Sequence, residues 1–176
     1  MTNLGYRLID PLEIEENLIK LISSDWMLIT AGNKAKFNTM TANWGGAGYL
    51  WNRPVVFVFV RPERYTYQFI ESSEKFTLSF FEEKYRSSLD ICGSKSGRDC
   101  NKIAEASLTP VFTELGNPTF KEARLVFECY KLYSEMLSKN FFHDPGPLNA
   151  HYDEGHSGLH KLYIAEILKV WETEKK

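Results

Sequence analysis

The sequence of 176 residues predicts a mainly β fold, in which antiparallel strands form a closed or partly closed barrel with helices around it. Short apolar segments of strand periodicity follow one another from residue 26. Turn signals separate them with no helix between, and such spacing favours antiparallel pairing. Two long alternating segments, 123–136 and 159–171, add the long strands that a barrel needs. The 12 Phe, 9 Tyr and 4 Trp residues suit a β-rich core and also stacking on a planar ligand.

The first expected element is an amphipathic helix in the N-terminal segment 1–25. It ends near residue 25 and is expected to cover one end of the sheet. Asp10 can cap this helix, Pro11 fits its first position, and Glu13 stands where a capping box needs it. Four apolar side chains then fall on one face, namely Ile14, Leu18, Leu21 and Ile22.

Turn signals, among them Gly45-Gly46, divide the rest of the chain into strands and three further helices. Strands are expected at 26–30, 37–43, 49–51, 55–60, 75–81, 123–136 and 159–171, and helices at 61–72, 82–92 and 99–106. Residues 138–158 form an irregular loop, because Pro, Gly and Asn break every period there. So long a connection is typical of a lid, a binding loop or a partly disordered tail.

Composition limits the class of protein. The formal net charge is −2, from 21 basic and 23 acidic residues, and nucleic-acid binding needs excess positive charge. The longest apolar run, Pro54 to Val60, is too short for a membrane span, and no signal peptide is visible. Cys92, Cys100 and Cys129 form no Cys-x-x-Cys pair, and their odd number favours reduced thiols. We expect one cytoplasmic domain over residues 1–176.

A first candidate site is the segment 61–66, which reads RPERYT. Its proline can set a first helical turn, which leaves free N–H groups at a helix N-terminus that favours anions. Arg61 and Arg64 suit bidentate contact with a phosphate, and Tyr65 and Thr66 add hydroxyls. The alternative is a solvated charged turn in which the glutamate neutralises one arginine.

A second candidate site is the segment 93–99, which reads GSKSGRD. Ser96 followed three residues later by Asp99 resembles a capping box, so a helix N-terminus is expected after this turn. Ser94 and Lys95 could then complete an anion cradle with backbone N–H groups, although the segment is not a Walker loop. An ordinary helix cap is the alternative. Two such features in one small domain favour a phosphorylated ligand.

A third candidate site is the segment 38–46, which reads NTMTANWGG. Its hydroxyls and amides suit hydrogen bonds to the polar edge of a ring, and its tryptophan suits an aromatic wall beside that ring. Its glycines allow a ligand or another backbone to approach closely. The alternative is an edge strand with a bulge at Gly45.

Direct side-chain catalysis and metal binding have weak support. The chain holds no Gly-x-Ser-x-Gly elbow, so a bound cofactor is the simplest source of chemistry. The four histidines lie close together in sequence, but their spacing fits no helical pair, so surface positions are favoured over a metal site. His160 is the exception, because it begins the last strand and could face a ligand. The others are His143, His151 and His156.

Together these segments resemble the flavin reductase-like family, the FMN-binding split barrels that include flavoredoxin. The resemblance rests on NTMTANWGG (38–46), VRPERYTY (60–67), FTLSFF (76–81), CGSKSGRD (92–99) with Lys102-Ile103, and HKLYIAEI (160–167). It implies an antiparallel Greek-key split β-barrel and a homodimer with FMN near the subunit interface. Ala165 departs from the glycine of the family pattern, and the loop 143–158 does not match it.

The resemblance also implies a role for each motif position. The phosphate and ribityl end of FMN would be held by Arg61, Arg64, Tyr65 and Thr66. The phosphate would be covered by Ser94, Lys95 and Ser96. The isoalloxazine ring would be lined by Thr39, Met40, Thr41, Asn43 and Trp44. No metal is expected in such a site, and the flavin carries the chemistry.

The function that follows is an FMN-dependent NAD(P)H oxidoreductase, a flavin reductase in which hydride passes from the nicotinamide to flavin N5. Its electron acceptor would be a small molecule or a protein. The alternative is a flavoredoxin-like electron carrier, with tightly bound FMN and a protein electron donor. A barrel that binds single-stranded nucleic acid is a third reading, but it needs a basic groove, which the net charge disfavours. Neither nucleic acid nor a membrane is an expected partner.

Overall fold

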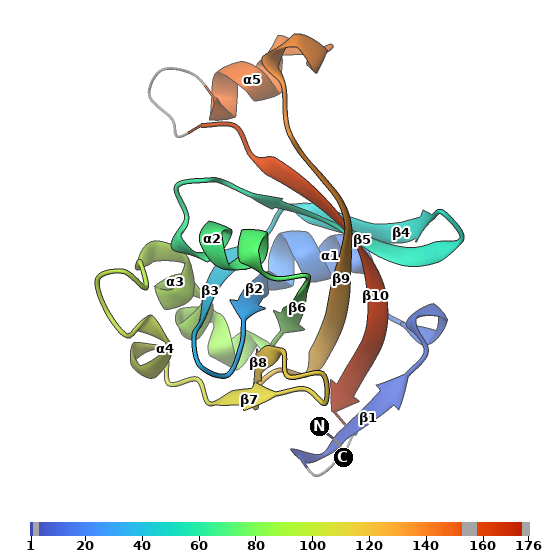
Figure 1. Cartoon of the computed structure of the whole chain (residues 1–176), viewed down its shortest axis with the longest axis vertical. Coiled ribbons are helices and arrows are strands. Elements are labelled where there is room, and N and C mark those ends of the chain that lie inside the picture. Colours follow the sequence, from blue (N-terminus) through green and yellow to red (C-terminus); the bar gives the residue numbers. More distant parts are fainter. Residues whose placement is uncertain (2–3, 153–157, 174–176) are drawn as a thin grey trace.

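The computed structural model describes residues 1, 4–152 and 158–173, and its main element is one curved antiparallel sheet of eight strands (Figure 1). Seven strands run in the order β3-β2-β6-β9-β10-β5-β4, and β1 pairs with β10. Their bounds are β1 Tyr6–Ile9, β2 Met27–Gly32, β3 Phe37–Ala42, β4 Gly45–Leu50, β5 Arg53–Val60, β6 Lys75–Phe80, β9 Leu125–Met136 and β10 Lys161–Thr173. Among the described pairings β3 and β4 do not join, so the sheet stays open there. The expected mainly β, antiparallel fold is confirmed.

The two long strands β9 and β10 hold the sheet together. They pair from Lys161 opposite Met136 to Glu172 opposite Leu125, with two register shifts on the way. Such bulges bend a strand and increase its twist. The bent β10 therefore pairs with β5 through its first half and with β1 through its second half.

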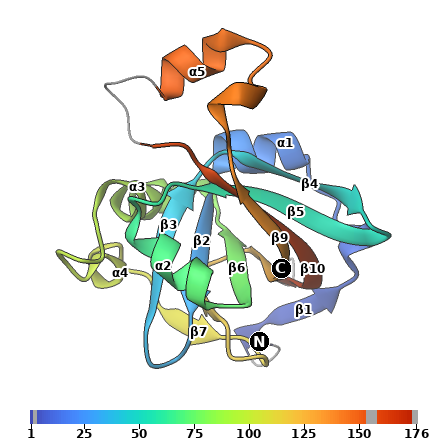
Figure 2. The same ribbon diagram turned by 45° about the horizontal axis from the view of Figure 1, so that its top comes forward.

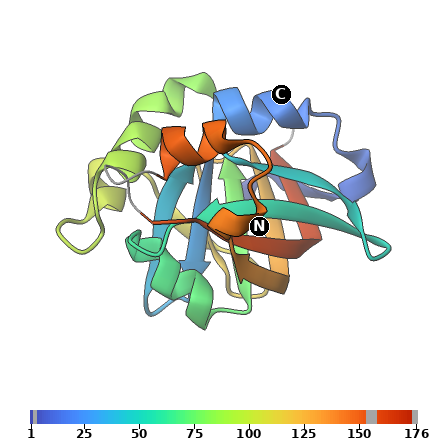
Figure 3. The same cartoon turned by 90° about the horizontal axis from the view of Figure 1, so that it is seen from above.

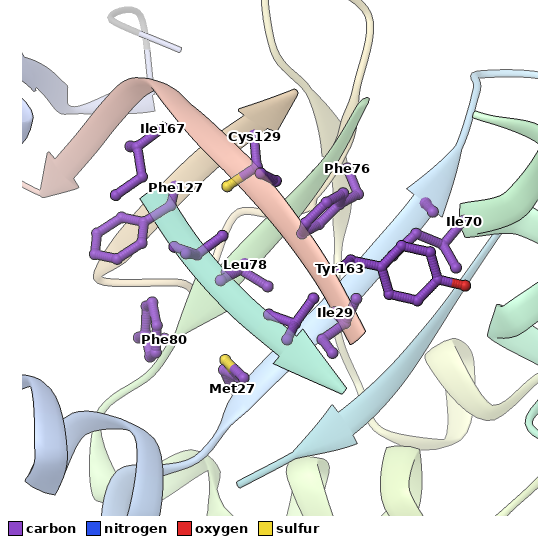
Figure 4. Close-up of a cluster of buried hydrophobic side chains, with 14 of the residues drawn as sticks. Met27, Ile29, Ile70, Phe76, Leu78, Phe80, Phe127, Cys129, Tyr163 and Ile167 are labelled. Atoms are coloured by element: carbon purple, nitrogen blue, oxygen red, sulfur yellow. The ribbon is translucent and has the colours of Figure 1, made fainter. Parts of the chain in front are cut away.

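The main hydrophobic core fills the inside of the curved sheet, and Figure 4 shows side chains from β2, β6, β9 and β10 converging there. Neighbouring residues of a strand point to opposite faces, so Met27 and Ile29 enter this core while Leu28 points outward. Leu28 joins a second buried cluster with Val126 and Trp171, outside the sheet. Burial on both faces explains why β2 and β9 are apolar without a clear alternation.

The N-terminal helix expected over residues 10–25 is wrong as one continuous element. The capping box of Asp10 and Glu13 is present, but it begins only a 3₁₀ turn, Pro11–Glu13, which ends at Ile14 in an extended conformation. A second cap, Asn17, then begins α1 (Leu18–Lys20), which continues as a π-helical turn over Leu21–Asp25. The strand β1 ahead of these turns was not expected from the sequence.

The turn expected at Gly45-Gly46 is also wrong, because β4 begins there. The chain reverses at Trp51-Asn52 instead, where both residues have positive φ (52° and 58°), as a two-residue type I′ hairpin turn requires. Gly45 has a φ of 157°, and a Cβ there would lie 2.6 Å from the Phe57 carbonyl oxygen. The glycine therefore serves the close approach of β4 to β5.

Helices cover the β3 end of the sheet, as Figures 1 and 2 show. They are α2 (Tyr65–Ser72), a 3₁₀ turn (Glu83–Tyr85) leading into α3 (Arg86–Ser94), and α4 (Lys102–Glu105). The capping box expected at Ser96 is wrong, because Asn101 caps α4 by accepting a hydrogen bond from the Ala104 N–H at 3.2 Å. The Ser96 hydroxyl accepts from the Arg98 N–H within the connecting turn.

Four further elements were not expected from the sequence. A hairpin of β7 (Pro110–Phe112) and β8 (Pro118–Phe120) packs against the outside of the sheet. Within the loop expected over 138–158 lie a 3₁₀ turn (Lys139–Phe141) and α5 (Pro145–His151). Residues 138–152, which we call the arm, stand beyond the barrel in Figures 1 and 2. The remainder of that expected loop includes residues 153–157, which lie outside the described residues.

The hairpin is fixed to the sheet by a buried carboxylate. Glu128 of β9 is fully buried, and its Oε1 accepts hydrogen bonds from the Thr113 hydroxyl and from Asn117 Nδ2, the latter at 2.6 Å. Thr77 adds a hydrogen bond from its hydroxyl to the Pro118 carbonyl at 2.6 Å.

We predict that Thr113→Val lowers the free energy of unfolding by about 1–3 kcal/mol, because a buried carboxylate loses one of its donors. Urea titration followed by circular dichroism measures this change. Thr109→Val, the same substitution at an exposed position beside the hairpin, is the control and should change stability by about 0.5 kcal/mol or less. Equal effects of the two variants would contradict the anchoring role of Glu128.

Candidate functional site

An open cavity of about 220 Å³ lies where the ends of β3 and β5, the turn before α2 and the start of β10 meet. Its lining includes six residues that the sequence motifs placed in one site: Met40, Thr41, Asn43, Trp44, Arg61 and Arg64. Ala42, Phe59 and His160 complete it. Two motifs that lie some 20 residues apart in the sequence therefore meet in space. Viewed from above in Figure 3, the α5 helix of the arm lies over this part of the sheet.

Three other residues of these motifs lie behind the cavity instead of in its wall. Thr39 is fully buried, with its hydroxyl 2.8 Å from that of Thr30. Thr66 is also fully buried and accepts a hydrogen bond from Asn38 Nδ2 at 2.8 Å. The Tyr65 ring packs against Phe69, and the Arg98 guanidinium lies 4.8 Å from the centre of the Tyr65 ring.

Ser94, Lys95 and Ser96 also lie outside the lining of the cavity. Ser94 is the last residue of α3 and donates its hydroxyl to the Asp90 carbonyl. The Lys95 ammonium pairs with Glu105. These residues therefore follow a helix C-terminus, whose partial charge is negative, and not the helix N-terminus that the sequence predicted.

Arg64 is the cation best placed to meet an anion in the cavity. It occupies the N-cap position of α2, which begins at Tyr65, so Pro62 precedes the helix instead of starting it. One Arg64 N–H donates to the Gly93 carbonyl at 2.9 Å. Burial, and then the charge of Arg61, lower the pKa of Arg64. Among the described residues no carboxylate pairs with Arg64, so a bound anion would offset the cost of burying this charge.

Arg61 connects the cavity to the arm. Its Nη2 donates to the His151 carbonyl at 3.2 Å, and its guanidinium lies 5.4 Å from the centre of the Tyr152 ring. The cation therefore orders the end of α5 while it lines the cavity.

Lys102 carries no role predicted from the sequence, yet it is a buried cation beside the site. It is only 3% exposed and donates to the carbonyls of Cys92 and Lys95, at 2.9 and 3.1 Å. Burial is the main cause that lowers its pKa to about 8. Lys102 and Arg64 thus both bind the C-terminal end of α3, which favours cations. The sequence signal for this residue was its place, as Lys102-Ile103, in one of the motifs on which the resemblance rests.

The expectation that His160 faces the site agrees with its position. It lines the cavity, and its Nδ1 lies 2.8 Å from the Tyr152 hydroxyl. The Trp44 ring packs against His160 and His151, with ring centres 5.1 and 4.9 Å away. Burial, followed by the charge of Arg61, lowers the pKa of His160 from 6.5 to about 4, so the imidazole is neutral at pH 7. No group of three His, Cys, Asp or Glu side chains with metal-binding geometry occurs in the described part of the chain.

We predict that stability falls as the pH is lowered from 6.5 towards 4, in part because of His160. The unfolded chain binds a proton near pH 6.5 and the folded chain only near pH 4, so acid favours unfolding in this interval. His160→Gln should reduce the pH dependence of the free energy of unfolding, measured by urea titration at pH 7, 6 and 5. His143→Gln, at an exposed position, should keep the wild-type dependence. An unchanged dependence in His160→Gln would contradict the burial of a neutral imidazole.

Comparisons with known proteins agree with this fold. Similar solved structures include an FMN-binding domain of a flavin reductases-like enzyme from Shewanella baltica OS155 (TM-score 0.67, 19% identity, 96% of this chain and 77% of that chain). Another is a flavoredoxin from Desulfovibrio vulgaris (TM-score 0.65, 22% identity, 93% of this chain and 75% of that chain). A third is a flavoredoxin from Methanosarcina acetivorans (TM-score 0.64, 24% identity, 85% of this chain and 69% of that chain). These likenesses show the split-barrel fold.

A search of curated proteins finds no significant match. Of the helices in the described residues, none has the length and apolar character that a membrane span requires. The model of the family described as "Flavin reductase like domain" matches residues 19–176. That match covers most of the sequence, and the chain therefore belongs to the flavin reductase-like family.

Proposed function

We propose that the cavity binds FMN and that the protein is an NAD(P)H-dependent flavin reductase. The observation that carries this proposal is the half-buried Arg64, which lines a cavity with a tryptophan in its wall. Among the described residues no carboxylate pairs with Arg64, and Arg61 lines the same cavity. A phosphate supplies the anion and a planar ring suits the wall. Support also comes from similar structures that are described as FMN-binding proteins, from Thermus thermophilus and Shewanella baltica.

The residues of the cavity fit the two ends of this cofactor. Arg61 and Arg64 would hold the phosphate. Asn43 and Thr41 would meet the polar edge of the ring system, and Trp44 would bound its apolar face. Thr41 already donates its hydroxyl to the Leu89 carbonyl at 2.5 Å, so it offers the cavity an acceptor.

The other motif residues lie behind the residues that line the cavity and would support them. Thr39 and Thr66 keep β3 and the start of α2 in place through the buried hydrogen bonds described above. A direct contact of Tyr65, Ser94, Lys95 or Ser96 with FMN stays a prediction from the resemblance.

Bound FMN would supply the redox chemistry by accepting hydride from a nicotinamide at N5. The chain must bind and orient the ring and leave one of its faces accessible. His160 is neutral at pH 7 and is not a strong acid. The positive charges that line the cavity are Arg61 and Arg64, which suit anion binding and not proton transfer.

We also propose a cytoplasmic homodimer with the site near its interface. A groove between α1 and β4 adjoins the cavity, because Asn43 and Trp44 line both. Beside it Ile19 is 80% exposed, and Tyr49 and Trp51 are exposed on the β4–β5 hairpin. Such apolar surface supports coverage by a second copy. The free thiols of Cys92, Cys100 and Cys129 support a reducing compartment.

We predict that Arg64→Ala weakens FMN binding by roughly tenfold to a hundredfold, because a hydrogen bond to a charged group contributes about 1.5–3 kcal/mol. Arg61→Ala should have an effect of the same order. Titration followed by quenching of flavin fluorescence measures the affinity, and circular dichroism checks the fold. Riboflavin, which lacks the phosphate, should bind wild type much more weakly than FMN.

Lys20→Ala is the control, since Lys20 ends α1 and does not line the cavity. Wild-type affinity for FMN in both arginine variants would place the phosphate elsewhere. The segment 94–96 would then be the next candidate.

A flavoredoxin-like electron carrier is the second candidate function, and it is favoured by the two flavoredoxins among the similar structures. Steady-state oxidation of NADH and NADPH with excess FMN separates the two functions. We expect a reductase to turn over at least one nicotinamide many times, at a rate that depends on added FMN. A carrier would keep its FMN through gel filtration and react poorly with both nicotinamides, which would contradict the reductase proposal.

A further inference from the structure

The arm places the side chain of Tyr152 directly behind two residues of the cavity lining, His160 and Arg61. It follows the last residue of α5, His151, and its ring is buried between Phe142 of the arm and His160 of the barrel. The Arg61 guanidinium faces the same ring. A residue from outside the barrel thus supports two residues that line the cavity.

The hydrogen bond between Tyr152 and His160 has a defined direction. Among the described residues its partner at the Tyr152 hydroxyl is His160 Nδ1, at 2.8 Å. Burial raises the pKa of Tyr152, so the phenol keeps its proton, and His160 is neutral. If Nδ1 carried the hydrogen, the buried phenol O–H would need a second acceptor. A buried donor without a partner costs about 1–3 kcal/mol, which favours donation from Tyr152 to a bare Nδ1.

The ring of His160 is also held in orientation. Trp44 packs against it at 5.1 Å, with an angle of 48° between the ring planes, and the Tyr152 ring meets it nearly at a right angle. Rotation of the imidazole by 180° would bring a carbon to the Tyr152 hydroxyl and lose the hydrogen bond. The remaining ring nitrogen, Nε2, is therefore the one left for an occupant of the cavity.

We propose that Tyr152 is a positioning residue that holds His160 in the tautomer with its hydrogen on Nε2. The cavity then presents three kinds of donor: the guanidinium groups of Arg61 and Arg64 for an anion, the Asn43 amide, and one uncharged imidazole N–H. That N–H suits an uncharged acceptor, such as a carbonyl oxygen or ring nitrogen of a bound flavin or nicotinamide. This contact with a ligand rests on the proposed function, whereas the tautomer of His160 does not.

The tautomer is tested by ¹⁵N NMR of protein labelled at histidine, in which His160→Gln identifies the signals that belong to this residue among the four histidines. At pH 7 we expect Nε2 to be of the protonated type and Nδ1 of the unprotonated type. The reverse assignment, or a doubly protonated ring, would overturn the proposal. This spectrum of the wild-type protein decides the tautomer without any Tyr152 variant.

Tyr152→Phe tests whether the tyrosine sets the tautomer. We expect both ring-nitrogen signals of His160 to move towards the average of the two tautomers, and its pKa to rise, because the neutral form loses a hydrogen bond. Arg61, Glu63 and His151 are the charged or titratable groups that act on His160, and they are unchanged in this variant. Tyr133→Phe is the matched control, since Tyr133 is exposed and its hydroxyl meets Glu135. Unchanged His160 signals in Tyr152→Phe would overturn the positioning role.

Titration with FMN separates this proposal from the proposed function. In Tyr152→Phe we expect the affinity for FMN to fall about threefold to tenfold, as for the loss of one neutral hydrogen bond. Wild-type affinity in a variant with altered His160 signals would overturn the contact between Nε2–H and the cofactor. Wild-type protein that binds no FMN would overturn the proposed function, while the NMR result would still decide the tautomer.

Discussion

The C-terminal end of α3 is the point on which the architecture of the site depends. Its carbonyl groups bind Arg64 from the turn before α2, Lys102 from α4 and, one turn earlier, the Thr41 hydroxyl from β3. Three separate segments are therefore fixed relative to one another by one helix end. The negative end of the helix dipole also explains why the buried Lys102 and the half-buried Arg64 can lie close together. Arg64 can then face the cavity with donors to spare, because only one of its N–H groups is used in this contact.

Most of the barrel was predictable, because short apolar segments such as β2, β5 and β6 are separated by turn signals with no helix between most of them. The elements that were missed are those that depend on distant partners. β1 has only four residues and exists because the end of β10 offers it an edge. The β7–β8 hairpin depends on the carboxylate of Glu128, whose partners lie 11 and 15 residues away.

The site shows the same division between local and distant signals. Residues 40–44 and the two arginines could be found from the sequence, because residue type and spacing carry the information. The segment 94–96 was placed at a helix start because Ser96 and Asp99 have the spacing of a capping box. In the structure Asn101 caps α4 instead, and the segment 94–96 lies at the end of α3. Lys102 and Tyr152 could not be found, since a buried cation and an aromatic side chain in an irregular segment acquire their roles only through tertiary contacts.

The arm lies in the connection between β9 and β10, which are neighbours in the sheet, and the Leu137 N–H donates to the His160 carbonyl at 2.9 Å at the base of that connection. In topological terms the arm is the long loop of a hairpin, so residues can be added or lost within it without shifting the register of any strand. The cost of a longer loop rises only slowly with its length. Change in this segment can therefore alter the support behind Trp44 and His160 while the barrel stays constant, which makes the arm a natural place for related proteins to diverge in what they accept.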